Sequence, residues 1–165
     1  SEDIKKYLQE DKKKRLFLMK LSYGYFFFGS EDYKLNTSNE VESQIQIRIK
    51  ELLNYNGYTI LSHNVLLGHY YRHLYQMIKM LENENSIKES ERYTYAKQLR
   101  AQLNDNEQLL LYYNAMSEIG AEWLKTCKKN IFGKEYQCPI ERFKMIKNIS
   151  VTEVLGVKPQ VVFVD

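Results

Sequence analysis

The middle of the sequence carries apolar side chains at intervals that a helix brings to one side. They fall at offsets 0, 4, 7, 11 and 14, as Leu67, Tyr71, Leu74, Ile78 and Leu81. Steps of three and four residues follow the period of an α-helix, whereas a strand changes face at every residue. The pattern predicts one long helix, from about Tyr58 to Leu81, with one face buried.

Composition and capping pairs extend this expectation along the chain. With only 7 Gly and 2 Pro in 165 residues, the sequence favours long helices with few tight turns. A capping residue followed three positions later by Glu predicts a helix start. Three such pairs occur: Thr37 with Glu40, Ser86 with Glu89, and Asn104 with Glu107. The third pair precedes an apolar stripe that predicts a helix as far as Cys127: Leu109, Tyr113, Met116, Gly120, Trp123 and Cys127.

These patterns predict an all-α fold, a helical bundle with antiparallel central helices joined by short loops. Residues 3–20 have a helix-like composition, and the aromatic segment 23–29 is expected to be packed inside. Pro139 should open a short helix reaching Lys147. We expect a single helical domain over residues 1–165, in which 151–165 form a tail that adds a short β-like strand or docks.

Charge and cysteine content exclude several classes of protein. A net charge of +3 does not by itself indicate nucleic-acid binding. The two cysteines, Cys127 and Cys138, have no metal-ligand spacing and fit free thiols in a reducing compartment. No apolar run approaches the roughly 20 residues that cross a bilayer. We therefore expect no metal, no cofactor and a cytoplasmic location, with membrane anchoring only through a segment ahead of residue 1.

The first candidate site lies on the predicted central helix. His69, Arg72, His73 and Gln76 project together, roughly opposite the apolar stripe. Two histidines four residues apart can share a metal, and His beside Arg suits proton transfer near a phosphate. A metal would need a third ligand, and this face has no acidic residue. The alternative interpretation is an exposed polar face, or histidines satisfied within tyrosine-rich packing.

Arg100 is the second candidate, because its spacing places it on the inward stripe with Tyr93, Ala96 and Leu103. An inward guanidinium needs compensation, so we expect a carboxylate or several carbonyls around it. Glu107 is one candidate partner. The two interpretations are a buried ion pair that fixes helix order and a site that recognises an anion or phosphate.

A polar line on the last long helix is the third candidate, with Glu107, Asn114 and Glu118 at offsets 0, 7 and 11. Two carboxylates on one face could serve acid–base or metal chemistry. Leu111 interrupts the line at offset 4, which favours a mixed packing face instead.

Three blocks resemble the AbiC-like family of putative phage abortive infection proteins. The first is Gly68-His69-Tyr70-Tyr71-Arg72-His73-Leu74-Tyr75. The second comprises Tyr95, Leu99-Arg100-Ala101-Gln102-Leu103 and Glu107 through Asn114, and the third Ile140-Glu141-Arg142-Phe143 with Ile146-Lys147-Asn148. Together they span about residues 65–150. The chain departs from the family at Asn104, where a hydroxyl cap is more usual, and at Tyr71, where Phe is common.

The resemblance implies a bacterial or prophage defence role, in which an infected cell is halted before phage spreads. It carries the positions His69, Arg72, His73, Arg100, Glu107 and Asn114 as expected site residues. Family members often have membrane-type segments ahead of this region, and none occurs here.

Two functions fit these residues. One is a sensor or interaction domain that binds a phage component or an anionic signal. This function is favoured because the sequence shows no complete set of catalytic residues. The alternative is a toxin-like, all-helical ribonuclease related in style to HEPN ribonucleases, which use Arg followed four to six residues later by His. Arg72 is followed at once by His73, which does not match that spacing. A ribonuclease site would therefore have to combine the Arg72/His73 pairs of two subunits in a homodimer that binds nucleic acid.

Overall fold

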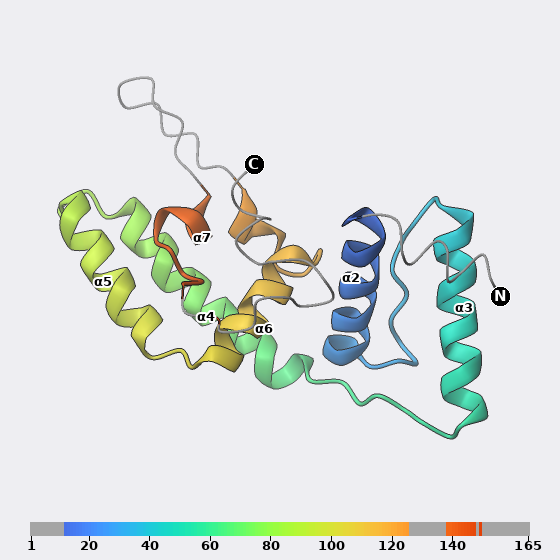
Figure 1. Cartoon of the computed structure of the whole chain (residues 1–165). Helices are drawn as coiled ribbons and strands as arrows, with labels where there is room; N and C mark the ends of the chain where they lie inside the picture. Colours follow the sequence, from blue (N-terminus) through green and yellow to red (C-terminus); the bar gives the residue numbers. More distant parts are fainter. Residues whose placement is uncertain (1–11, 126–137, 148, 150–165) are drawn as a thin grey trace. The chain divides into compact units, whose positions relative to one another are not determined.

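The structure, a computed structural model, describes residues 12–125, 138–147 and 149, and its regular elements in these ranges are all helices (Figure 1). The predicted all-α class is therefore confirmed. The described residues fall into two compact units, one ending at Gly68 and the other beginning at His69. A single domain over 1–165 stays a prediction, and Cys127 and the tail 151–165 lie outside the described residues.

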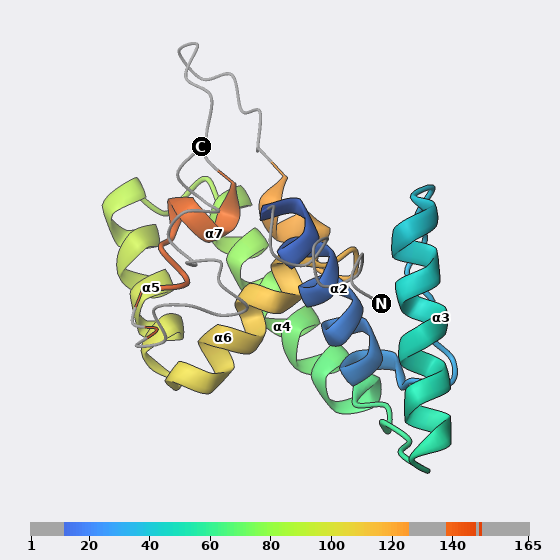
Figure 2. The same ribbon diagram turned by 45° about the vertical axis from the view of Figure 1, so that its right-hand side comes forward.

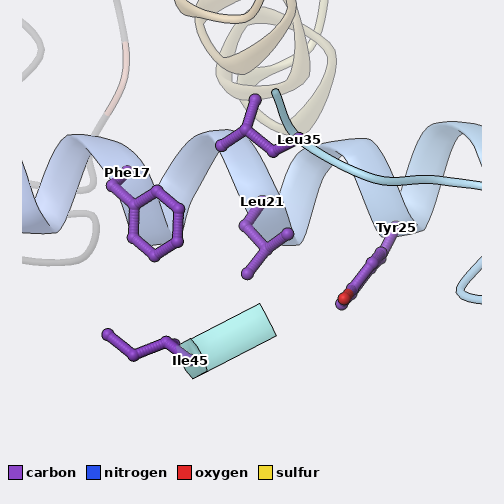
Figure 3. Close-up of a cluster of buried hydrophobic side chains, with 5 residues drawn as sticks. All are labelled: Phe17, Leu21, Tyr25, Leu35 and Ile45. Carbon is purple, nitrogen blue, oxygen red and sulfur yellow. The ribbon is translucent and has the colours of Figure 1, made fainter. Parts of the chain in front are cut away.

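The first unit is built on α2 (Lys12–Phe28) and α3 (Glu40–Tyr55). The aromatic segment forms the end of α2 and is buried or partly buried throughout, which confirms the prediction of a packed segment. Apolar side chains four residues apart on α2 face Ile45 of α3 (Figure 3). The buried cluster comprises Phe17, Leu21, Tyr25, Leu35 and Ile45.

A buried amide fixes the connection between these two helices. The Leu35 N–H donates to Gln46 Oε1, and Gln46 Nε2 donates to the Leu35 carbonyl, each at 3.0 Å. Because both backbone groups of Leu35 are paired, its side chain can enter the core without leaving polar atoms unsatisfied.

Two predicted starts in this part of the chain were wrong. The cap of α3 is Asn39, whose Oδ1 accepts from the N–H groups of Val41 and Glu42, while the Thr37 hydroxyl bonds to the Glu42 carboxylate. The central helix, α4 (Asn64–Asn83), begins six residues later than expected. The preceding segment is held to the end of α2 instead, with the His63 N–H donating to the Phe27 carbonyl at 3.0 Å.

The second unit contains α4 from His69 onward, α5 (Glu89–Ala101), α6 (Asp105–Met116), η1 (Ala121–Leu124) and α7 (Pro139–Arg142). After a short connection α5 runs back beside α4 (Figures 1 and 2), which confirms antiparallel central helices. The predicted stripe of α4 is also confirmed within this unit, since its inward side chains are buried: Tyr71, Leu74, Ile78 and Leu81.

The starts of α5 and α6 show one wrong and one correct capping pair. At α6 the Asn104 N–H donates to Glu107 Oε2 at 2.8 Å, and the Glu107 N–H donates to Asn104 Oδ1 at 3.0 Å. At α5 the N-cap is Lys88, and its N–H donates to Glu91 at 3.0 Å. The Ser86 hydroxyl donates to Glu84 instead.

Two helices are shorter than predicted. The last long helix, α6, ends at Met116 and not at residue 127 as predicted. The Asn114 carbonyl there accepts from the Ser117 N–H, the Ser117 hydroxyl and the Gly120 N–H, which closes the helix end. The helix that Pro139 opens stops at Arg142, because Lys144 adopts a positive φ of 48°.

Candidate functional site

The four polar side chains predicted to share a face of α4 are all exposed. His69, Arg72, His73 and Gln76 lie opposite the buried stripe of this helix. The same exposed side includes Met77 and Met80. The structure therefore brings the histidines and the arginine together at the surface, where they are available to a partner.

Glu107 reaches this helix through the residue next to His69. The Tyr70 hydroxyl donates to the Glu107 carboxylate, so burial, the Glu107 charge and this hydrogen bond raise the pKa of Tyr70. The same carboxylate caps α6. Glu107 thus links the start of α6 to α4, and its capping role follows the sequence prediction.

Arg100 faces inward as its spacing predicted, and its residue is only 6% exposed. Its Nη1 donates to the Lys144 carbonyl at 2.8 Å, and the guanidinium also donates to the Tyr93 hydroxyl oxygen. That hydrogen bond is the main cause that lowers the pKa of Tyr93. A carbonyl and a phenol therefore stabilise the buried positive charge of Arg100. Glu107, which the sequence offered as a candidate partner of Arg100, bonds to Tyr70 and Asn104 instead.

The predicted polar line along the last helix does not stay on one helix face. Asn114 is buried and shapes the end of α6, whereas Glu118 lies beyond that end and is exposed. Glu107 sits at the opposite end of α6. Glu107 and Glu118 are therefore not two carboxylates on one face of a single helix, as the predicted line required.

A polar network that the sequence did not predict holds α7 to α4 and α5. Arg142 Nη2 binds both oxygens of Glu89, at 2.7 and 2.9 Å. The buried Glu82 carboxylate lies 2.9 Å from Lys79 Nζ and 3.9 Å from Arg142 Nη1. One signal was available, because Glu82 follows Ile78 by four residues and so falls on the buried stripe.

Gln108 was also missed, although it lies on the buried side of α6. Its Nε2 donates to the Leu103 carbonyl at 3.3 Å, and its Oε1 accepts from the Lys147 N–H at 3.2 Å. Together with Arg100 it fixes the backbone that follows α7. Sequence spacing alone could not pair Gln108 with a residue 39 positions away.

Metal and thiol chemistry find no support in the described ranges. Within them no three His, Cys, Asp or Glu side chains are grouped to hold a metal. Cys138 is buried, and this burial raises the pKa of its thiol to about 11, so it is a poor nucleophile at neutral pH. None of the helices described here is both long and apolar enough to cross a bilayer.

Comparison with known families shows to which family this helical chain belongs. Residues 62–154 match the family described as putative phage abortive infection protein, and this range includes α4 through α7. Because the match covers more than half of the 165 residues, the chain belongs to this family of antiphage defence proteins. Searches of curated proteins and of solved structures found no significant match.

Proposed function

We propose that this chain is a sensor or interaction domain of an antiphage defence protein, and that the exposed face of α4 binds a phage component. The observation that carries this proposal is the joint exposure of His69, Arg72 and His73 on one helix face. Their positions lie in the family-matched region. Exposed polar side chains that have no partner within the described ranges suit recognition more than they suit core stability.

The chemistry of the face favours a partner that is both acidic and apolar. No Asp or Glu occurs from Asn64 through Leu81, so the face has no acidic group of its own along this helix. Met77 and Met80 add exposed thioether side chains, which adapt to varied apolar partners. A phage protein segment with carboxylates beside apolar side chains would complement both features.

The other candidate residues support binding over catalysis. Arg100 and Asn114 are buried and make hydrogen bonds within the chain. Glu107 completes a cap and bonds to Tyr70. A general base and an oriented partner within reach of an exposed reacting group would be needed for catalysis, and these residues do not supply them.

The test is phage plating on cells carrying the full-length gene, comparing wild type with His73→Ala and Arg72→Ala. Both variants should lose protection while keeping the wild-type melting temperature, because exposed side chains contribute little to stability. Arg48→Ala is the matched control: Arg48 is an exposed arginine of α3 that bonds only to the neighbouring Glu51 among the described residues, so protection should persist.

Phages that escape protection should carry changes in one phage protein, and purified His73→Ala should bind that protein more weakly. Full protection by both variants would refute the proposed face. Degradation of RNA on infection that requires both Arg72 and His73 would replace it with the ribonuclease alternative.

A further inference from the structure

Three basic residues of the second unit, Arg100, Lys144 and Lys147, interact electrostatically with the phenol of Tyr93. Arg100 donates to its hydroxyl oxygen, and Lys144 Nζ lies 5.9 Å from the centre of its ring. The Arg100 hydrogen bond, followed by the charges of Lys144, Arg100 and Lys147, lowers the pKa of Tyr93. The surroundings of this hydroxyl therefore favour negative charge.

Buried side chains hold the backbone that carries the two lysines. Arg100 binds the Lys144 carbonyl at 2.8 Å, and Gln108 accepts from the Lys147 N–H at 3.2 Å. Lys144 also has a φ of 48°, a left-handed conformation that a residue with a Cβ adopts at a cost. Packing and hydrogen bonds thus maintain this arrangement against the backbone preference of Lys144.

The cations of this cluster have no carboxylate to neutralise them within the described ranges. There, Arg100, Lys144 and Lys147 take part in no ion pair, while nearby Arg142 binds Glu89 and Lys79 binds Glu82. Positive charge that has no paired carboxylate among the described residues favours binding of an external anion.

The hydrogen-bonding pattern specifies the kind of anion. Because the Tyr93 oxygen accepts from Arg100, its own O–H remains able to donate to a ligand. An O–H donor near the Lys144 ammonium, with the charge of Lys147 acting on the same phenol, suits a compact oxyanion with several acceptors and more than one negative charge. A phosphate group has these properties, whereas a single carboxylate offers fewer acceptors and less charge.

We infer that Tyr93, Lys144 and Lys147, supported by Arg100, form a binding site for a phosphate group, carried either by free phosphate or by a small phosphorylated molecule. This inference goes beyond the proposed function, because it concerns side chains of α5 and the segment after α7 and a different ligand. Arg100 is a positioning residue in this site, since it acts through Tyr93 and the Lys144 backbone.

The test titrates inorganic phosphate, and separately adenosine 5′-monophosphate, into the purified full chain at constant ionic strength. Calorimetry should show saturable binding, and the amide shifts in nuclear magnetic resonance spectra should change around Tyr93, Lys144 and Lys147. Tighter binding of the nucleotide would identify a phosphorylated molecule as the ligand, and equal binding would identify free phosphate.

Two variants remove one ammonium group each, and both should raise the Kd on the order of tenfold, the loss expected for one charge-assisted contact. Lys144→Gly should still fold, because glycine adopts positive φ without strain. Lys147→Ala leaves the backbone N–H that donates to Gln108 in place.

Lys34→Ala is the charge-matched control, because Lys34 is an exposed lysine of the first unit. It should leave the Kd unchanged, and so should His73→Ala, which tests the α4 face separately. The inference is overturned if neither phosphate compound binds saturably, if both cluster variants bind like wild type, or if Lys34→Ala weakens binding equally.

Discussion

Lys144 combines an unfavourable backbone conformation with two hydrogen bonds that maintain it. At its φ of 48° the chain leaves α7, and the following Met145 N–H donates to the Ile140 carbonyl at 3.0 Å. The Lys144 carbonyl meanwhile accepts from the buried Arg100. Glycine is the usual residue at such a helix end, because it has no Cβ to crowd the backbone.

Replacing Lys144 with Gly should therefore stabilise the fold. Relief of the left-handed strain exceeds the greater flexibility of glycine in the unfolded chain, so the free energy of unfolding should rise by roughly 0.5 kcal/mol. Urea denaturation measures this change. Lys147→Gly is the matched control, because φ is not positive at Lys147, and it should lower the unfolding free energy by a similar amount. A loss of stability in Lys144→Gly would contradict the argument.

At the scale of the helix, two capping pairs with the same spacing in the sequence have different hydrogen bonds in the structure. Ser86-to-Glu89 and Asn104-to-Glu107 have the same three-residue spacing, yet only the second forms a reciprocal cap. The Glu89 carboxylate binds Arg142 instead, at 2.7 Å. Both members of the predicted pair thus bond elsewhere, and α5 begins at Glu89 with Lys88 as its N-cap.

Asn104→Ala should lower the free energy of unfolding by about 1 kcal/mol, because the N–H of Glu107 would lose its side-chain acceptor. Ser86→Ala should change it by less than about 0.5 kcal/mol, since its hydroxyl bonds only within an exposed turn. Thermal or urea denaturation of the two variants compares these positions directly. Equal effects would mean that the α6 cap contributes no special stability.

The stability of the whole molecule should depend on alkaline pH through buried phenols. Burial raises the pKa of Tyr112 from its ordinary 10.0 to about 12, and the pKa values of Tyr25 and Tyr113 also rise through burial. A group whose folded pKa is raised favours the folded state fully below its unfolded pKa. This contribution is present below pH 10 and is lost as pH increases toward 12.

Tyr112→Phe should therefore flatten the loss of stability above pH 10. Relative to wild type, it should retain about 2 to 3 kcal/mol more of its neutral-pH stability by pH 12. Urea denaturation at pH 8, 10 and 11 follows the trend. Tyr93→Phe should have the opposite effect and steepen the loss of stability at alkaline pH. The lowered pKa of Tyr93 favours the folded state there, and the variant loses this contribution. Parallel pH profiles for wild type and Tyr112→Phe would contradict the assigned cause.

Much of the candidate site could be predicted because it depends on position within a single helix. The spacing of His69, Arg72 and His73 on α4 was enough to place them opposite the apolar stripe, where the structure exposes them. The inward direction of Arg100 followed in the same way from Ala96 and Leu103. Whether the exposed side chains bind a phage component stays a prediction.

By itself, the sequence determined the all-α class, the buried side of α4 and the cap at Asn104, because these features arise from interactions within a few residues. Only the tertiary structure decided the partners of Arg100 and Arg142, which lie 44 and 53 positions away in the chain. The tertiary structure also decided that α4 begins later than the sequence predicts, because the segment before this helix pairs with the end of α2. A local period records which side of a helix is apolar, but it contains no information on which distant backbone group will meet that side.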